Sequence, residues 1–221
     1  MKVSRSLFMI GVILSGFMIP WTKEIVAVFL GKAYGMSAPV LVIMFLYPIH
    51  QSLGQIGGIM LMASGNTKAY MYISGIVMLC SLPISYIVQA PPMSSCVHGL
   101  GLGAIGMAIK MVSINIISVN VLAWVVARKN GWKFDWFCQI IGMSLMIGSG
   151  YLVKYVAELC WDLSLLNFKL LLPVAVSGIL YLVSAAIIIW RMPWLIGMDR
   201  DEFTNITNKI KFLHFLAGSK T

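Results

Sequence analysis

Residues 46–58, LYPIHQSLGQIGG, place a proline, a histidine, two glutamines and three glycines in the middle of an apolar run that extends from residue 37 to 63. In a soluble core these residues would mean loose packing, whereas in a membrane each polar side chain carries a desolvation cost. The composition decides between the two, because 60% of the 221 residues are hydrophobic and only 10% are charged. Ordinary soluble domains carry about a quarter charged residues. The sequence therefore predicts an integral membrane protein.

Six apolar runs are long enough to cross a bilayer as helices, which takes roughly 20 residues each. None alternates apolar and polar residues as membrane β-strands do, so helices are the spanning solution that pairs the backbone. The predicted fold is all-α and polytopic, with a six-helix transmembrane bundle over residues 1–191. We expect the spans near residues 6–22, 37–63, 69–90, 99–127, 138–157 and 169–191.

The first span resembles a secretory signal, because a basic start precedes an apolar run. No small-x-small cleavage site precedes Pro20, so we expect the helix to be retained. The next stretch, TKEIVAVFLGKAYG from Thr22, is too short and too charged to cross again. It is predicted to continue the first helix to the outer surface and to end at Gly31.

Basic residues indicate the orientation, because Lys and Arg favour the cytoplasmic loops. With both termini on one side, eleven basic residues lie there and four lie opposite, which predicts cytoplasmic termini. The net charge of +9 then reflects topology and contact with anionic membrane lipid, so no nucleic-acid partner is needed. The eleven are Lys2, Arg5, Lys68, Arg128, Lys129, Lys133, Arg191, Arg200, Lys209, Lys211 and Lys220, and the four are Lys23, Lys32, Lys154 and Lys169.

Residues 192–221 form a polar cytoplasmic tail in this topology. From Asp199, apolar residues recur at helical spacing, which predicts an amphipathic helix lying on the inner leaflet. A disordered tail is the alternative.

The second span carries a polar stripe near the bilayer midplane. At 100° per residue, Tyr47, Gln51, Gly54, Gln55 and Gly58 share one face, with His50 at its edge. Pro48 removes a backbone hydrogen bond and is expected to bend the helix, with Gly54 as a second hinge candidate. Cavity lining and simple interhelical packing stay open for the glutamines, whereas packing is favoured for His50.

Lys110 lies within the fourth span, on one face with Gly99, Gly103, Gly106 and Ser113. An ionised lysine near the bilayer centre costs about 2.5–3.5 kcal/mol on insertion scales. Snorkelling is the alternative, but over the predicted run the nearer interface lies about 15 Å away along the axis. We therefore favour an aqueous cavity or an anionic ligand, because the acidic residues of the chain lie at helix ends, in loops or in the tail.

An enzyme is not predicted, because catalytic acids, bases or metal ligands would have to cluster at one depth and only His50 lies deep. The four cysteines have no metal or redox spacing, so neither a metal nor a cofactor is expected. Cys96 and Cys160 fall on the same side, which leaves a disulfide open.

Three motifs resemble the polysaccharide and O-antigen flippases of the multidrug/oligosaccharidyl-lipid/polysaccharide exporter superfamily. They are FLGKAY at 29–34, ASGNTK at 63–68 and GLGAIG at 101–106. The resemblance covers about residues 5–127, with hydropathy alone beyond. It implies a MATE-like half bundle in a bacterial inner membrane that flips undecaprenyl-pyrophosphate-linked oligosaccharide by alternating access. Within that implied function, Lys110 contacts the pyrophosphate, Gln51, Gln55 and His50 offer hydrogen bonds to sugars, and Pro48 allows bending.

The chain corresponds to the second of the two bundles of such a transporter. We therefore expect a truncated half, or a half that associates with itself or with a separate N-terminal half. A cation-coupled small-molecule exporter half is one alternative. A non-transporting remnant or assembly partner of glycosyltransferases is the other.

Overall fold

The computed structural model describes residues 2–92, 98–131, 136–160, 171–198 and 200. Within these ranges the regular elements are helices, and no strand is present. They are α1 (Lys2–Met18), α2 (Thr22–Phe29), η1 (Lys32–Ser37), α3 (Ala38–Met44), α4 (Tyr47–Ala63), α5 (Thr67–Gln89), α6 (Gly103–Lys129), α7 (Trp136–Cys160), α8 (Leu171–Arg191) and η3 (Pro193–Ile196). The all-helical fold follows from the apolar runs, since a backbone in hydrocarbon must pair its own polar groups.

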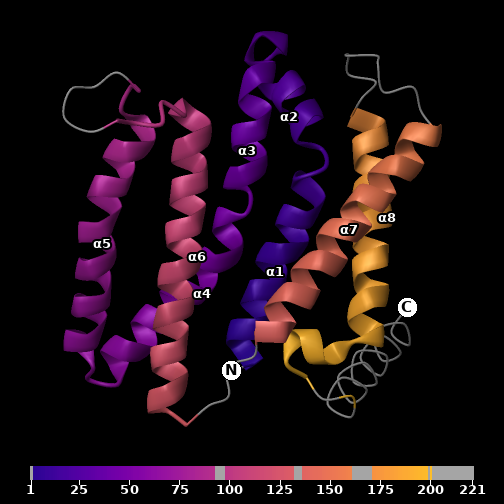
Figure 1. Ribbon diagram of the computed structural model, residues 1–221. Coiled ribbons are helices and arrows are strands. Elements are labelled where there is room, and N and C mark those ends of the chain that lie inside the picture. The colour runs from indigo at the N-terminus through magenta and orange to yellow at the C-terminus, as the bar shows by residue number, and fades with distance from the viewer. Residues whose placement is uncertain (1, 93–97, 132–135, 161–170, 199, 201–221) are drawn as a thin grey trace.

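Five helical segments are long and apolar enough to cross a membrane, and a sixth is added if the bent pair α1 and α2 counts as one span. The segments η1, α3 and α4 together form one of the five, Lys32–Ala63. Figure 1 shows the long segments running alternately up and down, so α1 begins and α8 ends at the same end of the bundle. Length and composition are those of a multi-pass membrane protein.

Helix α1 lies at the centre, between α4 on one side and α7 on the other (Figure 1). The main core joins α1, α4, α6, α7, α8 and η3. By contrast, α5 has no buried residue and packs mainly on α6. The main core consists of Phe8, Met9, Val12, Ile49, Leu53, Val119, Cys138, Met146, Ala185 and Leu195.

The predicted bend at Pro48 takes the form of a short break, because α3 ends at Met44 and α4 begins at Tyr47. Pro48 occupies the first turn of α4, where its missing N–H costs nothing. The Asn115 side chain of α6 donates a hydrogen bond to the Tyr47 carbonyl over 3.2 Å. A side chain of a neighbouring helix thus adds a hydrogen bond to the first carbonyl after the break and ties α6 to the start of α4.

The first helix differs from the prediction, because α2 does not continue α1 but turns away by 72° after Met18. Pro20 cannot continue the ladder of α1. The Thr22 hydroxyl donates to the carbonyls of Met18 and Ile19 at 2.9 and 2.8 Å, which satisfies part of the broken end. Helix α2 ends at Phe29, just before the predicted terminating residue Gly31, whose φ of 91° suits glycine.

The start of the predicted tail is packed rather than free. Leu195 of η3 is fully buried in the main core, and Ser6 of α1 donates to the Ile196 carbonyl over 3.2 Å. The tail helix expected beyond residue 199 lies outside the described residues, apart from residue 200, as does Cys96. The folded unit therefore extends past α8 to at least residue 198.

Contact between α1 and α7 depends on glycine, and this gives a matched pair of test variants. A Cβ on Gly150 would overlap the Gly16 carbonyl, whereas a Cβ on Gly148 would meet nothing within 4 Å. We expect Gly150→Ala to lower the free energy of unfolding by about 1–3 kcal/mol, the usual cost of overpacking. Chemical unfolding of the purified protein in detergent measures the loss. Gly148→Ala is the control, and equal stability of the two variants would contradict this packing.

Candidate functional site

The most polar cluster in the described part of the chain forms where α1 breaks. Lys154 of α7 places its Nζ 2.6 Å from Glu24 Oε1 and 2.9 Å from the Pro20 carbonyl oxygen. The lysine side chain is 13% exposed and that of Glu24 17%. This is a largely buried ion pair that joins the broken helix to a neighbouring span.

The break itself creates the need for Lys154. A carbonyl at the end of α1 has lost its helical donor, and the ammonium group supplies one. The same Nζ lies 5.4 Å from the Trp21 ring centroid, a cation–π distance, and 3.7 Å from Glu158 Oε1 one turn further along α7. Lys154 thus contacts two acids, a carbonyl and an indole face.

Two atoms of this cluster are buried without a hydrogen-bond partner among the described residues. They are Glu24 Oε2 and the indole Nε1 of Trp21, whose side chain is completely buried. Glu24 sits in the first turn of α2, where the helix dipole favours a negative charge. One carboxylate oxygen of Glu24 and the indole N–H of Trp21 are therefore still able to accept and to donate a hydrogen bond.

A cavity of about 530 Å³ opens beside the ion pair, between the α1–α2 break, α3 and α7. Polar and charged side chains form a substantial part of its lining. Lys154 lies six residues before Cys160, the end of α7, or about 9 Å along the axis. The cavity residues are Ile19, Pro20, Thr22, Lys23, Val42, Tyr151, Lys154, Tyr155 and Glu158.

The residues predicted from sequence do not form one site with this cluster. His50 is 4% exposed and packs edge-on against Phe8 of α1, with ring centroids 5.9 Å apart. Its Nδ1 has no hydrogen-bond partner in the described structure. This placement agrees with packing, the role that the sequence favoured for His50.

In the polar stripe of α4, the glycines pack against neighbouring helices, whereas the glutamines are half-buried or exposed. Gly54 packs against Val119 of α6 and Gly58 against Tyr70 of α5, so closely that an added Cβ would lie 2.7 and 3.0 Å from them. Helix α4 runs unbroken through Gly54, which acts here as a packing residue rather than a hinge. Gln51 is half-buried and Gln55 exposed, and neither makes a hydrogen bond to a described residue. The glutamines do not link helices in this conformation.

Lys110 is half-buried and Ser113 exposed on α6. No described residue forms an ion pair or hydrogen bond with the Lys110 ammonium group. Helix α6 begins at Gly103, seven residues earlier, so the nearer helix end is about 10 Å away rather than 15 Å. The lysine is therefore closer to a helix end than the predicted run indicated.

Sequence reasoning placed Lys154 among the residues of the outer side and did not identify its pairing with Glu24. The signal that could have found it is Pro20 four residues before Glu24, inside a stretch that otherwise continues as helix. A broken apolar helix frees a carbonyl at membrane depth, which calls for a donor from another span. Which span supplies it depends on tertiary packing.

Comparison of the chain with protein-family models, with curated proteins and with solved structures finds no match.

The ion pair gives a stability prediction. Lys154→Met leaves Glu24 buried without its partner, and breaking a buried pair in this way costs about 3–5 kcal/mol. The double variant Lys154→Met with Glu24→Gln removes both charges and should be more stable than Lys154→Met alone. Unfolding in detergent measures both, with the exposed Lys23→Met as control. A double variant no more stable than the single one would contradict a buried charge pair.

Proposed function

We propose that the chain is one bundle of an exporter that flips lipid-linked oligosaccharide units across the bacterial inner membrane for surface polysaccharide synthesis. The observation that supports transport is the α1–α2 break with its buried ion pair beside a polar cavity. Ionisable groups and broken helices at membrane depth are typical of transport pathways. The three motifs support the choice of substrate.

In this proposal a second bundle completes the translocation pathway. It comes from another copy of the chain or from a separate N-terminal half. The exposed edge of the α4 stripe, at Gln55, faces that bundle, because a glutamine is costly against lipid. The break at Pro48 and the bend between α1 and α2 are where the bundle changes shape as access alternates.

Glu24 gives a specific reason to retain a second candidate, a cation-coupled small-molecule exporter. Such an exporter needs a buried acid to hold the ion or the substrate. Glu24 has one carboxylate oxygen buried and unpaired, but Lys154 neutralises its charge. A coupling cation would therefore have to displace the lysine, which makes oligosaccharide export the better-supported function.

The first test of the proposal is disruption of the gene in its own host. We expect surface polysaccharide to be lost and lipid-linked oligosaccharide to accumulate, because units assembled at the inner face no longer cross. Immunoblotting of surface polysaccharide and mass spectrometry of extracted lipids measure the two effects, and a plasmid copy of the gene is the control. Unchanged polysaccharide and lipid pools would favour a small-molecule exporter or a non-transporting membrane protein.

The second test concerns the charge of Lys110. Lys110→Ala should reduce export about tenfold or more, because a hydrogen bond to a charged group contributes about 1.5–3 kcal/mol. Lys110→Arg keeps the charge and should retain most export. Polysaccharide export by the disrupted host carrying each variant gives the comparison, at matched membrane levels of protein. If both variants export normally, the anion contact is wrong.

A further inference from the structure

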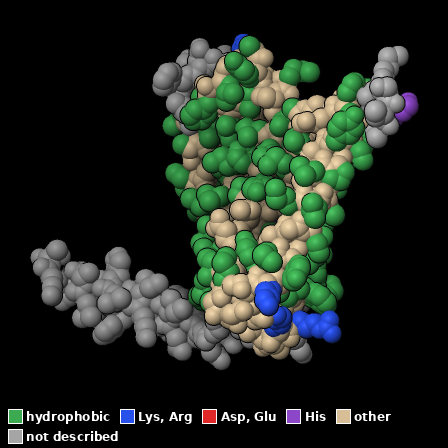
Figure 2. All heavy atoms as spheres, turned by 90° about the vertical axis from the view of Figure 1, so that its left-hand side faces the viewer, with side chains coloured by type: hydrophobic (Ala, Val, Ile, Leu, Met, Phe, Trp, Pro, Cys, Tyr) green, Lys and Arg blue, Asp and Glu red, His purple; other side chains and the backbone are tan. Residues whose placement is uncertain are grey.

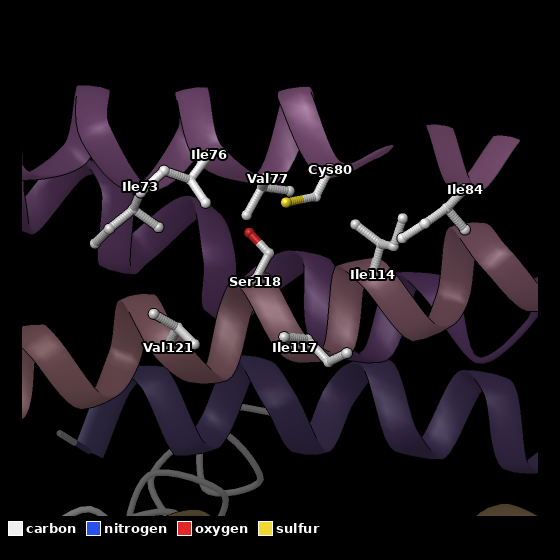
Figure 3. Close-up of a pocket in the computed structure, with 9 residues that line it drawn as sticks. All are labelled: Ile73, Ile76, Val77, Cys80, Ile84, Ile114, Ile117, Ser118 and Val121. Carbon is white, nitrogen blue, oxygen red and sulfur yellow. The ribbon is translucent and has the colours of Figure 1, made fainter. Parts of the chain in front are cut away.

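Charged side chains distinguish the cavity at the α1–α2 break from the apolar surfaces of the molecule. The groove between α5 and α6 is lined by apolar side chains apart from the Ser118 hydroxyl and the Cys80 thiol (Figure 3). The face seen from the α5 side is mostly hydrophobic, with Lys and Arg side chains mainly at its lower end (Figure 2). Neither of these surfaces combines a cavity with charged groups. The cavity at the break, in contrast, has Lys23, Lys154 and Glu158 in its lining.

The ammonium group of Lys154 is surrounded by oxygen atoms from separate parts of the chain. Its Nζ lies 2.6 Å from Glu24 Oε1 of α2, 2.9 Å from the Pro20 carbonyl oxygen and 3.7 Å from Glu158 Oε1 of α7. It also lies over the Trp21 ring, 5.4 Å from the centroid. Carboxylate oxygens, carbonyl oxygens and aromatic faces are groups that bind cations in proteins. The side chain therefore places its charge where a free cation would be held.

The broken helix supplies the backbone part of this arrangement. The carbonyls of Met18 and Ile19 accept hydrogen bonds from the Thr22 hydroxyl. The next carbonyl, that of Pro20, accepts from Lys154. A helix C-terminus carries a partial negative charge, and in broken helices of transporters such ends and unwound carbonyls coordinate Na⁺ or protons. The break therefore has the electrostatics of a cation site, whichever positive group occupies it.

Glu24 offers more to a cation than Lys154 uses. Its Oε2 is buried and has no hydrogen-bond partner among the described residues, whereas Oε1 contacts the ammonium group. A metal ion can bind both oxygens of one carboxylate, because it has no fixed donor direction. Lys154 and Glu158 line the cavity of about 530 Å³, so a hydrated ion can approach from it and keep part of its water. The site is accessible as well as preformed.

Distances and charge favour a monovalent ion of the size of K⁺ or ammonium. The two nearest oxygens lie 2.6 and 2.9 Å from the lysine nitrogen, whereas Mg²⁺ takes oxygens at about 2.0–2.1 Å and Ca²⁺ at about 2.3–2.6 Å. The described residues contain no cluster of three or more His, Cys, Asp or Glu side chains that could hold a metal ion. A single positive charge in place of Lys154 would also leave the balance with Glu24 unchanged.

We propose that the α1–α2 break is a binding site for one monovalent cation, which Lys154 fills with a tethered ammonium group. A free K⁺ or ammonium ion takes the same position once the lysine side chain is removed. In the wild-type protein the break stays in its cation-bound form and needs no ion from the medium. The inference goes beyond the proposed function, because it concerns what occupies the break and not what is exported. In the proposed exporter, ion coupling then has to act outside this break.

The test removes the tethered cation and supplies a free one. Lys154→Ala is purified in detergent with ammonium chloride and then transferred to ammonium, potassium or choline chloride at equal ionic strength. An ion that binds only the folded state stabilises it, and choline is too bulky to enter. We expect the variant to unfold at a temperature about 2–4 °C higher in ammonium and potassium than in choline. The wild-type protein should show no such difference, because its site is already filled.

Matched variants show whether the response comes from the break. Lys23→Ala removes an exposed lysine of the same cavity and should behave as the wild type does. Lys154→Arg keeps a tethered cation and should likewise give no response. Adding Glu24→Gln to Lys154→Ala removes the carboxylate, so the response to ammonium and potassium should disappear.

Direct binding gives a second measurement that does not depend on stability. Radioactive rubidium, which substitutes for K⁺, should bind to Lys154→Ala in detergent at one ion per chain. Ammonium should displace it and choline should not. The wild-type protein and the double variant should bind no rubidium.

The outcomes separate this site from the proposed function. The site would be overturned by an equal salt response of wild type and Lys154→Ala, by a response that persists in the double variant, or by Lys154→Ala that binds no rubidium. Failure of Lys154→Ala to fold even in ammonium chloride would also overturn it. None of these measurements depends on export. A specific cation response together with normal polysaccharide after gene disruption would overturn the proposed function while the cation site stands.

Discussion

The structure depends on one constraint, which is that backbone groups inside a membrane must find partners within the protein. Where α1 breaks at Pro20, that constraint recruits Thr22 from the break itself and Lys154 from α7. Lys154 brings a positive charge, and Glu24 balances it over 2.6 Å. A single helix break thus accounts for a hydrogen bond, an ion pair and the polar wall of a cavity.

Close contact between the helices has a second physical basis, because packing rather than water drives helix association in lipid. Glycines allow it where α1 meets α7 and where α4 meets α6, since an added Cβ would collide with Gly16 or Val119. Gly54 and Gly58, which belong to the polar stripe of the sequence, are therefore contact points. A glycine-rich face at membrane depth lines a cavity only where no neighbouring helix fills it.

The helical class and the end of α2 just before Gly31 could be predicted from the sequence, because each follows from local composition or backbone preference. Against the six predicted spans, the described residues hold five helical segments long and apolar enough to cross a membrane, and a sixth only if the bent pair α1 and α2 counts as one. The sequence also indicated a break at Pro48. It did not predict the 72° turn between α1 and α2 or the burial of Leu195, since both require knowing which surfaces meet. For the same reason, helical periodicity placed Gly54 and Gln55 on one face but could not tell that Gly54 packs against Val119 of α6 while Gln55 stays exposed.

Two lysines within long apolar helices, Lys154 and Lys110, show how surroundings decide the role of a charge. Lys154 is 13% exposed and has a carboxylate, a carbonyl and an indole around it, so its desolvation is offset within the protein. Lys110 is half-buried and has no such partner among the described residues. A charge whose cost is met internally serves stability. The charge of Lys110 has to be offset by something other than the described side chains, and in the proposed function the anionic substrate offsets it.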